Sequence, residues 1–385
     1  MTNGAGTDAA RLTRVATLAA DCPDIGGALR DQLGNDLALL ALFVTPRADF
    51  AAVCAAAAEA MPDTQVIACT TAGEIEHGYI EGRIVAFGLP HAHFRAATVA
   101  IPDLHRLDAA TQIRELILAR KTASRADPDF HHEFAFLMVD GLTMREDALM
   151  RVVAQGLGPV PLFGGSAGDG QRFDRCLVAR GGRVMTNAAV LAFVRTDCPI
   201  KVFSFDHLEP GTRRMVVTQA DRDRRIVRRI NDEPAAREYA RILGKDPDQL
   251  STFTFAGHPL VVRVGGQYYV RSIQRVTEDG DLVFYSAIDE GVVLTLANTR
   301  DIAQTLAEDL RAIADAGDLD RVLICDCVLR RQEAEQTQRV HQMSDTFRRH
   351  DVVGFSTYGE QYGATHVNMT MTGVAFYHPQ QAQRR

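Results

Sequence analysis

Residues 66–74 read VIACTTAGE, residues 161–169 read PLFGGSAGD, and residues 352–360 read VVGFSTYGE. In each stretch an apolar or small run leads into Ser or Thr, one further residue, Gly and a carboxylate. An apolar run that stops at a small-residue turn is typical of the end of a buried strand, and Gly permits backbone conformations and close approaches that other residues resist. The repetition predicts one structural unit that is used three times.

The segments that flank the three glycine turns repeat as well. An apolar run of strand length comes before each turn and another comes after it: residues 37–45, 134–141 and 321–328 before, and 83–89, 189–194 and 373–378 after. Near-continuous apolar runs are typical of strands that are covered on both faces. Each unit is therefore expected to contribute buried strands to the core.

A helix is expected between the first strand of each unit and the strand that ends at the turn. The first of these helices has an apolar stripe at helical spacing, and the third, over about residues 330–350, is mostly polar. In the second, Thr143 and Glu146 have the spacing of a capping box. Strand, helix and strand in this order predict a parallel pair with a right-handed crossover in each unit.

The middle of the chain has a different pattern. Residues 200–286 consist of short alternating runs separated by Gly-containing turns, which predict antiparallel strands and hairpins. We interpret the basic run at 222–230 as a solvated strand face. The predicted fold is α/β, with an N-terminal helical segment at 1–36, a first domain at 37–230, and a second domain at 231–385 that is richer in antiparallel strands.

Composition limits the class of protein. A chain of 385 residues exceeds one ordinary core, so two domains are expected. The formal net charge of −7, with acids and bases well mixed, argues against nucleic acid or an anionic membrane as the main partner. No apolar stretch reaches the roughly 20 residues of a membrane span, and no secretion signal is recognisable. Seven scattered Cys fit a reducing cytoplasm.

The three glycine turns end in carboxylates at Glu74, Asp169 and Glu360. Such acids can work as an acid–base pair, but more often they cap the turn that follows, and capping is the favoured interpretation. The turns lack the Lys of a Walker loop and the spacings of GxGxxG and GxSxG. We interpret Cys325 and Cys327 as core thiols, because no further metal-ligand motif accompanies them.

His366 has the most informative context of the twelve histidines. It lies at the start of an expected strand, where alternation places His366, Asn368 and Thr370 on one face. The chain has no CxxCH string, which excludes a covalently attached c-type haem. A non-covalent haem needs an axial imidazole or thiolate, a flat apolar cavity and partners for its propionates. On spacing alone a structural role for His366 is favoured, with haem ligation as the alternative.

Several motifs together resemble the FIST family of bacterial sensory domains. They are CTTAGEI with GY (69–79), FGGSAGDG (163–170), PAAREYARILG (234–244), YYVRSIQRV (268–276), IDEGVVLTLA (288–297) and YGEQYGATHVNMT (358–370). The closing motif looks most like that of the nitric-oxide-sensing haem proteins of this family (NosP), with Met369 where an amide is usual. The resemblance implies a two-part α/β fold, a cytoplasmic location and a role in signal input rather than catalysis.

For the haem branch, the resemblance implies haem b, binding of nitric oxide at the iron, and control of a separate sensor histidine kinase or cyclic-di-GMP enzyme. Our leading hypothesis is therefore a haem-based nitric oxide sensor with His366 as the axial ligand of the iron. Arg271 or Arg263 is expected to hold the propionates. The other expected cavity residues are Phe355, Tyr358, Tyr362 and Met371.

The alternative hypothesis is a FIST module that binds a small polar ligand such as an amino acid, without haem. Its acids would meet an ammonium group while nearby N–H groups hold a carboxylate. The expected ligand-binding residues are Glu74, Asp169, Glu360, Ser166 and Thr71. A third hypothesis is an enzyme built on the paired acids. The sequence leaves a homo-oligomer open.

Overall fold

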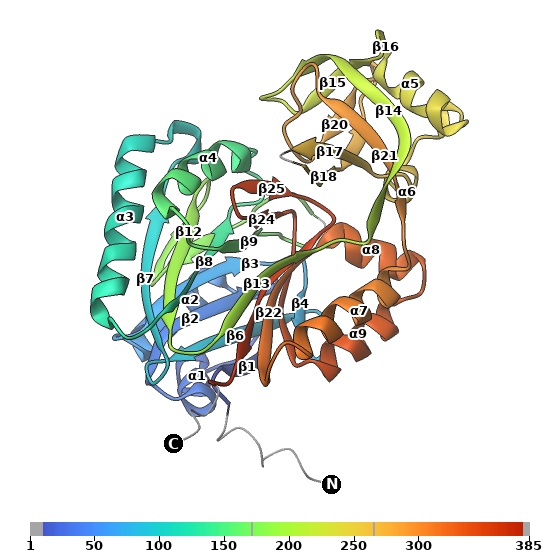
Figure 1. Cartoon of the computed structure of the whole chain (residues 1–385). Coiled ribbons are helices and arrows are strands. Elements are labelled where there is room, and N and C mark those ends of the chain that lie inside the picture. Colours follow the sequence, from blue (N-terminus) through green and yellow to red (C-terminus); the bar gives the residue numbers. More distant parts are fainter. Residues whose placement is uncertain (1–10, 171, 265, 380–385) are drawn as a thin grey trace, which may run out of the picture.

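The computed structural model describes residues 11–170, 172–264 and 266–379. It has a main body built from three six-stranded sheets and a smaller lobe built from antiparallel strands (Figure 1). The smaller lobe is joined to the main body by two long strands that run side by side, β14 (Leu208–Asp221) and β21 (Val293–Thr299). The predicted α/β fold is confirmed.

Each sheet of the main body contains one of the three predicted units. The first strand of each unit is parallel to the strand that ends at the glycine turn, as predicted: β2 (Leu37–Val44) with β3 (Gln65–Thr70), β8 (His132–Val139) with β9 (Leu162–Ser166), and β22 (Leu319–Cys327) with β23 (Val352–Thr357). Farther along the chain, after two short strands, each unit has a longer strand that pairs antiparallel with its first strand: β6 (Arg83–Pro90), β12 (Ala189–Thr196) and β26 (Met371–Tyr377). The three units share one topology.

The three sheets exchange strands in a closed cycle. After its glycine turn, each unit sends its next strand into the sheet of another unit. The strand β4 (Glu74–Glu76) pairs with β23, β24 (Glu360–Tyr362) pairs with β9, and β10 (Val178–Arg180) pairs with β3. The sequence pattern did not predict this exchange. It means that no sheet of the main body is completed by one unit alone.

The remaining strands of the main body lie at or near the sheet edges. In the first sheet these are β1 (Arg14–Ala19) and β11 (Arg183–Met185), in the second β7 (Phe94–Ile101) and β25 (Thr365–Val367), and in the third β5 (Tyr79–Ile80) and β13 (Ile200–Phe205). The helices are α1 (Ile25–Leu33), α2 (Phe50–Ala60), α3 (Ala109–Ala126), α4 (Glu146–Leu157), α7 (Ile302–Ala314), α8 (Val328–Gln336) and α9 (Val340–Arg349).

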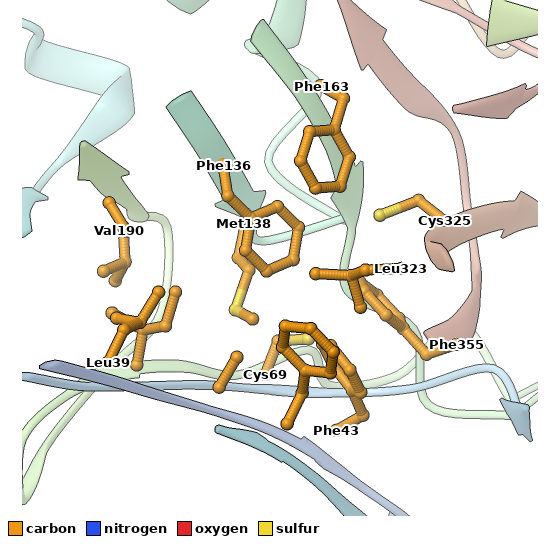
Figure 2. Close-up of a cluster of buried hydrophobic side chains, with 14 of the residues drawn as sticks. Leu39, Phe43, Cys69, Phe136, Met138, Phe163, Val190, Leu323, Cys325 and Phe355 are labelled. Carbon is orange, nitrogen blue, oxygen red and sulfur yellow. The ribbon is translucent and has the colours of Figure 1, made fainter. Parts of the chain in front are cut away.

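A hydrophobic core lies between the inner faces of the three sheets (Figure 2). Its side chains alternate along the strands with others that face the helices, as the period of a strand requires. Phe43 and Phe355, from two different sheets, stack with their ring centroids 4.6 Å apart. Phe136 and Phe163 stack at 4.7 Å. Because both faces of each sheet are buried, the strands read as near-continuous apolar runs.

Each outer sheet face is covered by its own helices. The helices α1 and α2 pack on the first sheet, α3 and α4 on the second, and α7 and α9 on the third. Figure 1 shows α3 and α4 on one side of the body and α7, α8 and α9 on another. The main body thus has one central core between the sheets and three peripheral cores under the helices.

The smaller lobe confirms the antiparallel pattern predicted for the middle of the chain. Its other strands are β15 (Ile226–Ile230), β16 (Glu233–Pro234), β17 (Leu260–Val264), β18 (Gln267–Arg271), β19 (Ile273–Val276) and β20 (Leu282–Phe284), with helices α5 (Ala235–Leu243) and α6 (Thr252–Gly257). They enclose a separate hydrophobic core that includes Tyr239 and Phe284. After this lobe the chain returns to the main body, where the third unit packs with the first two.

Two helix predictions were wrong in detail. The N-terminal segment was expected to be helical, yet residues 14–19 form β1, which pairs antiparallel with β6. The sheet edge at β6 outweighs the helical tendency of an Ala- and Leu-rich segment, as tertiary context often does. Residues 1–10 of that prediction lie outside the described part. The single helix expected over 330–350 is two helices, and the chain turns between them at Gln338, whose φ is 58°.

Replacing Asp49 by Ala is expected to lower the free energy of unfolding by about 1 kcal/mol. Asp49 is the N-cap of α2, and its carboxylate accepts a hydrogen bond of 3.0 Å from the backbone N–H of Ala52. Asp49→Asn keeps an acceptor at the same place and is expected to restore most of the loss. Urea unfolding of the two variants checks the prediction, and equal losses would contradict it.

Candidate functional site

The three glycine turns meet and bond to one another. Between the first and third turns, the N–H of Ala72 donates to the carbonyl of Ser356 at 2.9 Å, and the N–H of Ser356 donates to the carbonyl of Gly73 at 2.8 Å. The N–H of Ser166, in the second turn, donates to the carbonyl of Gly359 at 2.8 Å. These bonds link the ends of strands from all three sheets.

The packing at this junction explains why the turns carry Gly. A Cβ added at Gly168 would lie 2.7 Å from the backbone N of Ala72. A Cβ added at Gly359 would lie 2.5 Å from Cε1 of His366. Both distances are too short for unbonded atoms, and in the first case the neighbour is rigid backbone. Close approach therefore requires Gly at the two positions.

The acids of the first and third turns fulfil the capping interpretation. Thr71 donates to Glu74 at 2.5 Å, and the N–H of Arg83 donates to the same carboxylate at 3.1 Å. In the third turn Thr357 donates to Glu360 at 2.5 Å. Thr370 donates to Glu360 as well, through its hydroxyl at 2.7 Å and its N–H at 3.2 Å. Each acid ties its turn to the start of the strand that follows.

Asp169 of the second turn is capped more completely. Its carboxylate accepts hydrogen bonds from Tyr358 Oη at 2.5 Å and from the backbone N–H groups of Phe173, Asp174 and Arg175 at 2.9, 2.8 and 2.8 Å. The phenol of Tyr358 is thereby held between the second and third turns. A carboxylate with this many donors is a structural group.

The three acids differ in proton affinity although they occupy equivalent places. Burial raises the pKa of Glu74, and its hydrogen bonds with Thr71 and Arg83 oppose the shift. Burial raises the pKa of Glu360 to about 8. Burial alone would also raise the pKa of Asp169, but the hydrogen bonds from Tyr358 and three backbone N–H groups hold it below its usual value. Hydrogen bonding to the charged form decides the difference.

A cavity of about 480 Å³ opens beside the first two turns. Its wall includes Glu74 and Asp169, so the structure brings together two of the acids singled out in the sequence, whereas Glu360 is buried away from it. The other wall residues come from neighbouring loops and from α8: Thr45, Pro46, Arg47, Ala72, Gly73, Glu81, Gly82, Gly170, Arg172, Val328, Arg331, Gln332 and Glu335. This volume suits a small organic molecule.

Arg331, on α8, is the central charged group of this wall. Its Nη2 lies 2.7 Å from a carboxylate oxygen of Glu81, and its Nε lies 3.1 Å from one of Glu335. Its Nη1 is buried without a hydrogen-bond partner among the residues that the structure describes. That nitrogen is the atom nearest to where a Cβ of Gly73 would stand, so the missing side chain of Gly73 makes room for it.

His366 lies in a second, buried polar cluster at the top of the main body. Its Nδ1 is 3.1 Å from the carbonyl oxygen of Glu360 and 3.3 Å from Nε2 of Gln361. Gln361 also donates to Ser166 at 2.9 Å. Burial lowers the pKa of His366, opposed by the carboxylates of α4, so the imidazole is neutral near pH 7. Within the described residues, Gln361 Oε1 and Asn368 Nδ2 lack partners.

The residues expected to surround a haem are not gathered around His366. Phe355 lies in the central core, and Met371 lies in the peripheral core under α7 and α9. Tyr358 is engaged with Asp169, and Tyr362 is half-buried at the end of β24.

The two arginines expected to hold the haem propionates differ in their surroundings. Arg271 is buried, with Nη1 3.5 Å from the carbonyl oxygen of His366, and Arg263 is exposed beside the ring of Tyr268. Among the described residues, His366 lines neither the cavity beside the glycine turns nor the cavity whose wall includes Arg263 and Arg271. The residues expected around a haem thus lie in separate parts of the described structure.

Two family models match the sequence. The FIST N domain matches residues 38–233, and the FIST C domain matches residues 235–363. The chain belongs to the FIST family. FIST domains are sensory, ligand-binding modules rather than catalytic domains. No curated protein matches the sequence.

The two FIST matches divide the chain inside the smaller lobe rather than between the lobe and the main body. β14 and β15 fall in the FIST N match, whereas β17 to β21 fall in the FIST C match. The FIST C match ends before His366 and Asn368. In the part of the chain that the structure describes, no helix combines the length and the apolar character needed to cross a membrane.

Several polar residues of this FIST protein were missed from the sequence. Glu146 was expected in a capping box, but α4 has no side-chain cap, and Glu146 instead forms a buried ion pair with Arg225. Arg225 lies in the basic run that was interpreted as exposed, so that interpretation was wrong at this position. Thr143 bonds to Asn187 at 2.9 Å. Arg331 gave no sequence signal, because its role depends on contacts with distant loops.

Proposed function

We propose that this protein is a FIST sensory module that binds a small zwitterionic ligand, such as an amino acid, in the cavity beside the first two glycine turns. The observation that carries the proposal is Arg331, a residue of the cavity wall whose buried Nη1 has no hydrogen-bond partner among the residues that the structure describes. A buried donor without a partner costs free energy. A ligand carboxylate would supply the missing acceptor, and guanidinium groups suit carboxylates in geometry and charge.

The cavity wall carries charges of both signs. Arg47 and Arg172 add positive charge near Arg331, while Glu81 and Glu335 are partly exposed carboxylates at the same wall. Glu81 and Glu335 also pair with Arg331, but they are exposed, whereas Glu74 and Asp169 are buried and satisfied by hydrogen bonds from the chain. The two exposed acids are therefore the more accessible partners for a ligand ammonium group. A molecule with one carboxylate and one ammonium group matches this distribution.

The position of the cavity suits a sensor. Its wall combines the first two turns with α8 of the third unit, so a bound ligand would contact all three units. In open α/β sheets, ligands commonly bind at the carboxyl ends of strands where neighbouring connections diverge. Here the segments that follow the three glycine turns enter different sheets. We propose that a bound ligand alters how the three units pack, and that a separate signalling protein, such as a histidine kinase or a cyclic-di-GMP enzyme, responds to this altered packing.

A thermal-shift screen of the standard amino acids and short dicarboxylic acids tests the proposal. A ligand at 100 times its dissociation constant is expected to add about 2.7 kcal/mol to the free energy of unfolding. Arg331→Ala is expected to abolish the shift and Arg331→Lys to retain part of it. Arg348→Ala is the matched control, because Arg348 is an exposed arginine on α9 paired with Asp345. The absence of a shift with every compound would end this proposal.

Haem-based sensing of nitric oxide is the second candidate. The observation that favours it is the buried cluster around His366, where a neutral imidazole lies near Gln361 Oε1 and Asn368 Nδ2, two polar atoms that have no partner among the described residues. If this candidate holds, protein from cells supplied with a haem precursor will show a Soret band that moves when nitric oxide is added after reduction. His366→Ala is expected to abolish that band. A colourless protein that cannot be reconstituted with haem would rule the candidate out.

A further inference from the structure

Three potential metal ligands converge at one end of the second sheet, outside both sites described above. His93 lies in the turn between β6 and β7, and Asp197 and Cys198 lie between β12 and β13. Because Phe94 of β7 pairs with Thr196 of β12, the next residues outward, His93 and Asp197, are neighbours. The pairing of β7 with β12 therefore holds the side chains of His93 and Asp197 next to each other.

The donor atoms of this cluster lie close together. His93 Nδ1 is 3.1 and 3.2 Å from the two carboxylate oxygens of Asp197. The thiol of Cys198 donates to Asp197 Oδ1 at 3.2 Å. The imidazole, carboxylate and sulfur ligand atoms all lie within 4.8 Å of one another. One small ion could thus contact all three.

We propose that His93, Asp197 and Cys198 form a transition-metal site suited to Zn²⁺. Zinc–ligand bonds of about 2.0–2.3 Å in a tetrahedron place the ligand atoms about 3.3–3.8 Å apart. The printed separations from Asp197 to His93 Nδ1 and to Cys198 Sγ, 3.1–3.2 Å, lie just below this range, and all three ligand atoms lie within 4.8 Å of one another. Thiolate and imidazole ligands favour Zn²⁺ over Mg²⁺ or Ca²⁺, which prefer oxygen.

The surroundings fit a site with three protein ligands. Cys198 is buried, and its backbone N–H donates to Thr196 Oγ1 at 3.0 Å, which fixes the loop that carries the sulfur. The side chains of His93 and Asp197 keep 35% and 38% of their exposure, so the fourth position faces solvent and can hold water. When the sulfur–metal bond forms, the thiol proton leaves to solvent and its hydrogen bond to Asp197 is replaced by metal coordination.

Cobalt titration of the full chain, after removal of metal with a chelator, tests the site. Co²⁺ is expected to bind with a stoichiometry of one and to give a thiolate-to-metal charge-transfer band that Zn²⁺ displaces. Cys198→Ser is expected to remove the band. His93→Ala and Asp197→Asn are each expected to weaken Co²⁺ binding at least tenfold, and because both side chains are partly exposed these variants should fold.

The chain supplies matched controls. His77 lies 3.1 Å from Glu76 in a histidine–carboxylate pair that is not part of this cluster, and Cys22 is a partly exposed thiol elsewhere. His77→Ala and Cys22→Ser are expected to leave the band and the affinity unchanged. Failure of the wild-type chain to give the band would show that His93 and Asp197 form only a hydrogen-bonded pair at the surface. A band that persists in Cys198→Ser would equally overturn the proposal.

Discussion

Replacing Glu146 by Ala is expected to lower the free energy of unfolding by about 3–5 kcal/mol, because the change leaves the guanidinium of Arg225 buried without its counter-charge. Glu146 begins α4, and Arg225 lies in the turn between β14 and β15 of the smaller lobe. Their side chains retain only 3% and 7% of their exposure. Arg225 also donates to the carbonyl of Tyr285, which fixes the guanidinium in place.

A less buried ion pair, between α3 and β8, is the control. Arg120 and Glu133 lie 2.6 Å apart with side-chain exposures of 31% and 25%. Glu133→Ala is expected to cost less than about 1 kcal/mol, because solvent screens the lost interaction. Urea unfolding of both variants measures the difference. If Glu146→Ala costs no more than Glu133→Ala, the buried pair does not stabilise the contact between lobe and main body.

The Glu146–Arg225 pair belongs to a polar seam between the smaller lobe and the main body. The N–H of Ala287 donates to Asp147 at 3.2 Å, and Ser286 donates to Asn368 at 2.5 Å. Arg271 of β18 adds its contact with the carbonyl of His366. Polar contacts of this kind fix one relative position of two parts with more directional precision than apolar packing does. The seam therefore fixes the position of the lobe on the main body.

The three strand units could be predicted because the residues that specify each strand and its turn are neighbours in the sequence. Strands buried on both faces, such as β2 and β22, appear as near-continuous apolar runs, and small residues end them at turns. The cyclic exchange of β4, β10 and β24 could not be predicted in the same way. Those strands have three residues each, and a pattern of that length does not specify which sheet they join.

In the candidate site too, roles that depend on neighbouring residues could be predicted, whereas roles that depend on distant residues could not. The capping role of Glu74 depends on Thr71, three residues away, and was the favoured interpretation from the sequence. Arg331 contacts Glu81 across 250 positions of the chain, and Arg225 contacts Glu146 across 79. One sequence does not reveal pairs at such separations, because their side chains carry no local period. The local signal at Glu146 even suggested a different role.

The unfolding free energy of the wild-type protein is expected to contain a pH-dependent contribution from Glu360 that Glu360→Gln removes. The pKa of this carboxyl is about 8 in the folded state, compared with 4.5 for an ordinary Glu. Between these values the folded protein holds a proton that the unfolded chain releases. Raising the pH therefore favours unfolding, with a slope that approaches about 1.4 kcal/mol per pH unit from this group.

The sign of the effect is opposite to that of a salt-bridged acid. The stabilising contribution of Glu360 is fully present below about pH 4.5, is lost as the pH rises through 8, and stays lost above it. A Gln side chain has nearly the same shape, can accept from Thr370 and can donate to Thr357, and does not titrate. At pH 8 and above, Glu360→Gln is thus expected to be more stable than the wild-type protein.

Urea unfolding of both proteins between pH 5 and pH 9 measures this contribution as the difference between the two curves. Other buried acids with raised pKa values, such as Glu74 and Asp140, add slopes of the same sign but are common to both proteins, so they cancel in the difference. Glu115→Gln, at an exposed position of α3, is expected to run parallel to the wild-type curve. A constant difference between wild type and Glu360→Gln would mean that Glu360 is ionised in the folded protein, held by Thr357 and Thr370 despite its burial.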